Sequence, residues 1–222
     1  MKILFVAPHP DDETLGCGGT ILRHKFLRDK IYWIIATNIF VEDGFAKKMV
    51  KQRQKEIDNV SRLYSFEKTF KLNYPTSKLD KYPMLEIIYN IRKILNRIKP
   101  DIIYLPNGND PHTDHQITYG AVSASLKSFR CPFLKKVLMY ECISETEFAI
   151  HRQDEVFIPN VFVDISKYIN MKIKIMKIYK GELKKHPFPR SIRNIKALAV
   201  FRGATMGVKY AESFMLNREF LK

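Results

Sequence analysis

Short apolar runs alternate with longer segments of helical periodicity through the first two thirds of the chain. The apolar runs are typical of buried strands and span residues 2–7, 31–37, 68–72, 101–105 and 136–140. The segments between them have helical spacing or helix-forming composition and span residues 14–28, 45–64, 84–98 and 113–127. This alternation predicts an α/β, Rossmann-like fold: a mostly parallel twisted sheet, strand order 3-2-1-4-5, with helices on both faces.

The pattern weakens beyond residue 142. Residues 161–165 predict a further strand, whereas residues 167–183 show both period two and helical spacing. We interpret 167–183 as one helix, because the run is too long for a single strand, and expect a short helix to begin at Ser191. The sequence has no internal repeat, low-complexity tract or linker, so we expect a single domain over residues 1–222.

The predicted strand order makes the first and fourth strands neighbours. The loops that leave their carboxyl ends, residues 8–13 and 106–115, should therefore face one crevice. These two loops also carry more reactive side chains than any other segment of the sequence.

The first loop reads PHPDDETLGCGGT. His9 and Asp12 are three residues apart, so at a tight turn or helix start they can point the same way, whereas Asp11 projects elsewhere. A solvated acidic helix start is the alternative interpretation. The glycines do not form a dinucleotide-binding fingerprint, because Ile21 stands where the third glycine belongs; close packing of the helix explains them better.

The second loop, PNGNDPHTDHQ, concentrates two imidazoles and two carboxylates: Asp110, His112, Asp114 and His115. If one of these histidines joins His9 and Asp12, two imidazoles and a carboxylate surround a metal ion, with positions left open for water and substrate. Spacing alone does not decide which histidine or which aspartate binds, and a purely structural histidine is the alternative.

Two metal chemistries use such a ligand set. A hydrolase needs a Lewis-acid metal and a nearby carboxylate that accepts a proton. A non-haem iron enzyme also uses two histidines and one carboxylate, and H-x-D with a distant histidine is present as His9, Asp11 and His115. The additional carboxylate and the α/β pattern favour the hydrolase.

Composition is ordinary for a globular protein apart from its charge. Of 222 residues, 45% are hydrophobic and 27% charged, which excludes disordered and collagen-like chains. The net charge of +15 suggests nucleic acid, a membrane surface or an anionic substrate. No nucleic-acid recognition motif is visible and the basic residues are spread over helices, so a basic module that binds nucleic acid or acidic lipid is only the non-enzymatic alternative. Three scattered cysteines, no signal peptide and no apolar run of 18 residues favour a cytoplasmic protein.

Taken together, the motifs resemble the PIG-L/LmbE-type deacetylases. The resemblance rests on HPDDE, H-x-D-H, GCGGT, Arg53 with Glu56, and the terminal RG…G…YAESF. It implies zinc-dependent hydrolysis of an N-acetyl group, usually on a glucosamine-containing conjugate. By position it implies that zinc is held by His9, Asp12 and His115, with Asp11 as general base.

The same resemblance assigns the remaining site residues. His112 would stabilise the oxyanion as a protonated imidazole held by Asp114, and Arg53 would lie near the substrate. It leaves Glu212 either structural or functional. We expect one Zn²⁺ per chain, with Fe²⁺ as the alternative metal.

The expected partner is a small-molecule N-acetylated sugar conjugate and not nucleic acid. The +15 charge favours an anionic substrate, or one presented at an anionic membrane surface, which implies peripheral membrane contact. Homo-oligomers occur among the resembling proteins. Substrate choice is expected to depend on the loops at residues 40–45, 73–82 and 142–159.

Overall fold

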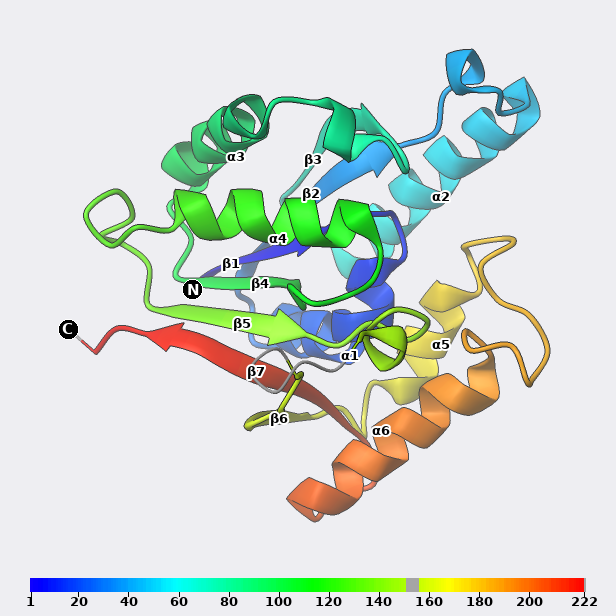
Figure 1. Cartoon of the computed structure of the whole chain (residues 1–222). Helices are drawn as coiled ribbons and strands as arrows, with labels where there is room; N and C mark the ends of the chain where they lie inside the picture. Colours follow the sequence, from blue (N-terminus) through cyan, green and yellow to red (C-terminus); the bar gives the residue numbers. More distant parts are fainter. Residues whose placement is uncertain (151–155, 222) are drawn as a thin grey trace.

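A seven-stranded sheet forms the centre of the molecule (Figure 1), which we describe from a computed structural model of residues 1–150 and 156–221. The strands are β1 (Lys2–Ala7), β2 (Lys30–Asn38), β3 (Lys68–Pro75), β4 (Ile102–Pro106), β5 (Lys136–Tyr140), β6 (Val161–Asp164) and β7 (Ala211–Glu219). The helices are α1 (Asp12–Phe26), α2 (Lys47–Tyr64), α3 (Met84–Ile98), α4 (Thr113–Ser125), α5 (Ile169–Met176) and α6 (Ile192–Met206). Part of the 142–159 loop, residues 151–155, lies outside the described residues.

The strand order is β3-β2-β1-β4-β5-β7-β6. The expected order 3-2-1-4-5 is confirmed for the five parallel strands. The sheet then continues into β7 and β6, which are antiparallel to their neighbours. We did not predict β7: its buried residues include Glu212 and Ser213, so the apolar pattern that identifies a strand is interrupted there.

Helices cover both faces of the sheet, as predicted. In β1, Ile3 and Phe5 belong to the core beneath α1, α2, α5 and α6, whereas Leu4 and Val6 belong to the core beneath α3 and α4. Figure 1 shows α3 and α4 on one side of the sheet and α1, α5 and α6 on the other. Burial on both faces explains why these strands read as continuous apolar runs.

The carboxyl-terminal third differs from the prediction in its helices. The expected helix over 167–183 is shortened to α5, which is followed by turns up to Ser191. The helix that follows is longer than expected: α6 has 15 residues and is capped by the Ser191 hydroxyl, which accepts a hydrogen bond from the Asn194 amide at 3.2 Å. No helix of the described residues combines the length and the apolar character needed to cross a membrane.

The GCGGT and YAESF motifs contact each other and fix the position of α1. A Cβ added to Gly19 would lie 2.4 Å from Ile165, so only glycine allows this close approach, as the sequence suggested. The buried Glu212 carboxylate accepts hydrogen bonds from the amides of Gly19 (2.8 Å) and Thr20 (2.7 Å). Lys172, equally buried, pairs with Glu212 at 2.7 Å. Glu212 therefore has a structural role.

Candidate active site

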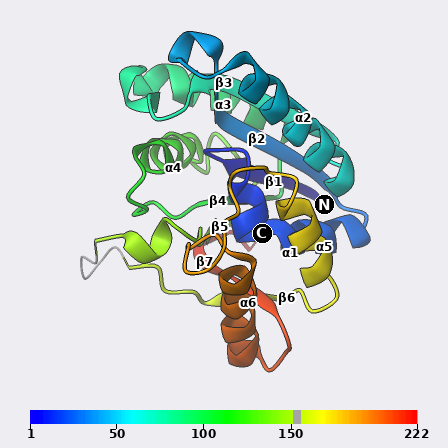
Figure 2. The same ribbon diagram turned by 90° about the vertical axis from the view of Figure 1, so that its right-hand side faces the viewer.

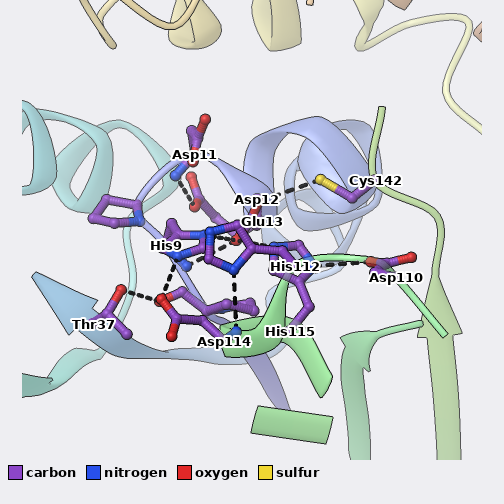
Figure 3. A network of polar contacts seen from close by, with 12 residues as sticks. His9, Asp11, Asp12, Glu13, Thr37, Asp110, His112, Asp114, His115 and Cys142 are labelled. Carbon is purple, nitrogen blue, oxygen red and sulfur yellow. Dashed lines mark hydrogen bonds and ion pairs between the residues drawn. The ribbon is translucent and has the colours of Figure 1, made fainter. Parts of the chain in front are cut away.

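The two loops expected to meet do meet, at the carboxyl ends of β1 and β4 (Figure 3). His9 lies between β1 and α1, and Asp12 is the first residue of α1. His112 and His115 flank the start of α4, with His112 at its N-cap. Because β1 and β4 are parallel neighbours, their following loops bring together side chains that are about 100 positions apart in the sequence.

His9, Asp12 and His115 form a compact group of potential metal ligands. Oδ2 of Asp12 lies 3.4 Å from Nδ1 of His9 and 3.3 Å from Nε2 of His115. One ligand atom from each residue lies within 4.8 Å of the other two. Nε2 of His115 is buried and makes no hydrogen bond, which is costly unless a cation accepts its lone pair. The group therefore fits a divalent metal with two imidazole ligands and one carboxylate.

His9, His112 and Asp114 form a second group within the same distance limit. Its carboxylate already has partners: Asp114 accepts hydrogen bonds from the amides of Ser77 (2.7 Å) and Leu79 (3.2 Å) and contacts Nε2 of His9 at 2.9 Å. Both oxygens of Asp114 are thus engaged by backbone amides, whereas Asp12 accepts one amide hydrogen bond, from His9 at 2.8 Å. Because Asp12 also faces the unsatisfied Nε2 of His115, the group around Asp12 is the better metal site.

Each histidine of the Asp12 group is oriented by a buried carboxylate. Asp114 contacts Nε2 of His9, and Asp110 contacts Nδ1 of His115 at 2.8 Å. The other ring nitrogen of each histidine consequently faces Asp12, as in many carboxylate–histidine–metal sites. The sequence placed Asp110 in the loop but gave no signal for this role.

The acidic neighbours make the group attractive to positive charge. Although burial opposes it, Asp114 and Asp12 raise the pKa of His9 to about 9. In the same way, Asp12 and Asp110 outweigh burial and raise the pKa of His115 well above its ordinary range. An environment that stabilises two imidazolium ions also stabilises a bound metal cation, which would replace the protons.

Asp11 has an unusual backbone conformation. It precedes α1 with φ 144° and ψ −29°, a region that non-glycine residues rarely adopt. Its amide donates a 3.1 Å hydrogen bond to the buried carboxylate of Glu13, which also accepts from Tyr179 at 2.8 Å. Burial, reinforced by the charge of Asp12, raises the pKa of the Asp11 carboxyl well above its ordinary range, as suits a group that takes up and releases a proton near neutral pH.

The structure contradicts the expected pairing of His112 with Asp114. The Asp114 amide, not its carboxylate, contacts the ring and donates a 3.1 Å hydrogen bond to Nδ1 of His112. Burial and the neighbouring His9 lower the pKa of His112 to about 4. Nδ1 of His112 is thus an acceptor, which leaves Nε2 as the ring nitrogen that carries a proton.

A pocket of about 350 Å³ opens beside these groups and is lined by His9, Asp11, Asp12, Arg53, His112, Glu145, Glu182 and Arg190, among others. Arg53 lies in its wall and donates a 2.9 Å hydrogen bond to the carbonyl of Pro10 and another to Glu182. Arg190 pairs with the other oxygen of Glu182 at 3.4 Å. Sequence reasoning missed Glu182 and Arg190, which lie in a segment without a motif. Larger hollows exist beside β5 and α6 but contain none of the three metal-ligand candidates.

The chain matches a known protein family. The PIG-L family, described as GlcNAc-PI de-N-acetylase, matches residues 4–126, more than half of the chain and both loops of the site. The chain belongs to the PIG-L family. The resemblance stated from its motifs is confirmed.

Relatives of this PIG-L family member include sugar deacetylases. Diacetylchitobiose deacetylase of Thermococcus kodakarensis is 24% identical over 223 residues, which cover 95% of this chain and 81% of the relative. A probable N-acetyl-α-D-glucosaminyl L-malate deacetylase of Bacillus anthracis is 23% identical over 81% of this chain and 80% of its own length. The structure of N,N′-diacetylchitobiose deacetylase from Pyrococcus horikoshii superposes with a TM-score of 0.77 at 24% identity, covering 97% of this chain and 83% of that one. This likeness confirms the α/β fold.

Proposed function

We propose that this PIG-L family member hydrolyses the N-acetyl group of an amino-sugar conjugate and releases acetate and a free amine. The observation that carries the proposal is the unpartnered, buried Nε2 of His115 facing Asp12 and His9 at the wall of a pocket, in a chain whose relatives include sugar deacetylases. We also propose one domain over residues 1–222 and a cytoplasmic location. The three cysteines are all free and buried, which suits a reducing compartment.

In this proposal His9, Asp12 and His115 hold one Zn²⁺ per chain, with Fe²⁺ as the alternative. The bound metal supplies Lewis-acid chemistry: it lowers the pKa of water toward about 7 and polarises the acetyl carbonyl. Asp110 and Asp114 keep the two imidazoles in the tautomers that ligation needs.

Asp11 is the proposed general base. Its raised pKa suits a carboxylate that takes a proton from the attacking water and later passes it to the departing amine. His112 acts as a neutral donor, since the proton on its Nε2 can hydrogen-bond the oxyanion that forms on the acetyl carbon. This revises the charged imidazolium that the resemblance implied.

Arg53 is the proposed substrate contact, and the charges around it indicate which substrate part enters the pocket. The lining has two arginines, Arg53 and Arg190, against four carboxyl groups, those of Asp11, Asp12, Glu145 and Glu182. With all six groups ionised, a divalent metal would bring the net charge of this set to zero. An uncharged N-acetylated sugar therefore fits better than an anionic one. The pocket itself does not use the excess positive charge of the chain.

An acetate-release assay on the Zn²⁺-loaded protein tests the proposal. The panel should include N,N′-diacetylchitobiose, an N-acetylglucosaminyl malate and a GlcNAc-phosphatidylinositol, with His115→Ala as the control expected to lose metal and activity. Oxygen-dependent turnover of the Fe²⁺-loaded protein, without acetate release, would favour the non-haem iron alternative. A protein with stoichiometric metal that releases acetate from no N-acetylated sugar would contradict the proposal.

A further inference from the structure

The net positive charge of the chain is concentrated in one segment, although basic residues as such occur on most of the helices. Residues 165–210 contain twelve lysines and arginines but only one acidic residue, Glu182. This stretch of 46 residues therefore carries +11 of the net +15. It comprises α5, the turns that follow it, and α6.

This segment lies on the face of the molecule that carries the pocket. Figure 2 shows α5, the following turns and α6 on the same face as the start of α1. The segment contacts α2, because Glu182 pairs with Arg53 and the Lys180 amide donates a 3.0 Å hydrogen bond to Glu56. Residues from α2 and from this segment therefore stand together around the pocket mouth.

Eight exposed lysines on these two elements form what we call the cationic rim. Its members are Lys47, Lys48, Lys51 and Lys55 of α2 with Lys177, Lys180, Lys184 and Lys185 of the segment after α5. None of the eight forms an ion pair with any residue that the structure describes. Nearby acids are already neutralised: Arg53 and Arg190 flank Glu182, and Asp43 pairs with Lys78 at 2.6 Å, which leaves Glu42 exposed.

The rim is too extended and too exposed to serve a small anion in the pocket. The eight lysines are exposed and none of them lines the pocket, whereas the pocket lining has more carboxyl groups than arginines. A cationic surface larger than the pocket requires a counter-charge of similar extent.

Apolar side chains stand among the lysines. Val41 is 48% exposed, Met49 is 53% exposed, and Phe45 lines the mouth of the pocket one helical turn before Met49. Lysines interspersed with exposed apolar side chains are typical of surfaces that rest on anionic bilayers, where the lysines attract acidic headgroups and the apolar groups enter the interface. A nucleic acid would use the charge but not Val41 and Met49.

We propose that the cationic rim docks this protein on the surface of an anionic lipid bilayer, with the pocket mouth turned toward the headgroups. Docking is independent of the proposed deacetylase activity, because none of the eight lysines of the rim lines the pocket. Binding to vesicles and acetate release can therefore be measured separately.

The test is co-sedimentation of the full chain with vesicles of phosphatidylcholine alone and with about one third phosphatidylglycerol. We expect clear binding only to the anionic vesicles, weakening as salt shortens the screening length. The variant Lys180→Gln/Lys184→Gln/Lys185→Gln should lose about a hundredfold in affinity, taking about fivefold per lysine near an anionic surface. The matched control, Lys30→Gln/Lys68→Gln/Lys127→Gln, removes the same charge from exposed lysines at the start of β2, at the start of β3 and after α4, and should bind nearly as wild type.

Met49→Ser should weaken vesicle binding relative to wild type, and more clearly at high salt, because salt screens the lysines but leaves the apolar contribution. Equal losses in the rim and control variants would overturn the proposal, as would equal binding to neutral and anionic vesicles or no binding at low salt. Binding to RNA that matches the vesicle affinity and is indifferent to Met49→Ser would identify a polyanion surface instead. If the wild type is a dimer that does not bind vesicles, and the rim variant is a monomer, the rim is instead an interface between copies of the chain. Acetate release from a soluble substrate is measured on the rim variant as well, and we expect it to be unchanged. This second measurement distinguishes a failure of docking from a failure of the proposed function.

Discussion

Replacing Glu13 by alanine should impair catalysis without removing the metal. The carboxylate is completely buried and accepts hydrogen bonds from the Asp11 amide (3.1 Å), the Tyr179 hydroxyl (2.8 Å) and the Thr14 hydroxyl (2.5 Å). Its bond to Asp11 helps to hold that residue at φ 144°, a conformation that costs about 1–3 kcal/mol. Asp12 and the histidines do not bond to Glu13, so Glu13→Ala should keep its metal content.

The magnitude follows from the groups that lose a partner. The Asp11 amide and the hydroxyls of Tyr179 and Thr14 would each lose their acceptor, at about 1–3 kcal/mol per group, so the free energy of unfolding should fall by about 3–9 kcal/mol. If the Asp11 backbone relaxes, the carboxylate leaves its catalytic position, and restoring that position costs the same strain of about 1–3 kcal/mol. The activation free energy then rises by this amount, so kcat should fall roughly 5- to 150-fold, while KM changes little.

Steady-state acetate release, metal analysis and urea unfolding measure the three quantities on the same sample. Glu13→Gln is the matched control, because its amide oxygen can still accept the Asp11 N–H, and it should keep kcat within about fivefold of wild type. Tyr179→Phe removes only the remote bond, so it should cost about 1 kcal/mol of stability and little rate. Wild-type kcat in Glu13→Ala, or an equal loss in Glu13→Gln, would refute the reasoning.

Three further changes probe other parts of the structure. Asp110→Ala frees the His115 ring and should weaken metal binding about 10- to 100-fold in a chelator competition; unchanged affinity would deny Asp110 its orienting role. Lys172→Met leaves Glu212 as an unpaired buried charge and should lower the free energy of unfolding by about 3–5 kcal/mol in urea. The double variant Lys172→Met/Glu212→Gln should recover about half of this loss, whereas a loss equal to the sum of the two single variants would argue against coupling. Burial lowers the pKa of His24 below 6.5, so the unfolded chain binds more protons and stability falls as pH drops below about 6.5. His24→Gln in the metal-free protein should show a smaller fall between pH 7 and about pH 5.5 than wild type, and equal slopes would contradict the assignment.

The sequence predicted the parallel part of the fold because doubly buried strands leave continuous apolar runs. It could not predict β7, whose buried Glu212 is satisfied by Lys172 of α5 and by two amides of α1, nearly 200 positions away. It also could not show where α5 ends, because the stabilising contacts of residues 177–190 come from α2. Local periodicity contains no information about such tertiary partners.

Part of the candidate site was likewise predictable from the sequence. Two loops rich in His and Asp were enough to predict that the loops meet, whereas the three metal-ligand candidates came from the family resemblance and not from the spacing. The roles of Asp110 and Asp114 were not accessible, because spacing does not reveal which oxygen faces which ring nitrogen. Glu182 and Arg190 enter the pocket from a segment whose sequence has no catalytic pattern. The uneven charge was visible in the sequence, but its placement beside the pocket needed the fold.

Metal content measured together with acetate release in Asp11→Asn tests the central claim most directly. The account predicts one Zn²⁺ per chain, as in the wild type, with a rate at least about a hundredfold lower, the scale of general-base catalysis. His115→Ala, measured alongside, should lose the metal itself. A fully active Asp11→Asn variant, or normal metal content in His115→Ala, would contradict the account.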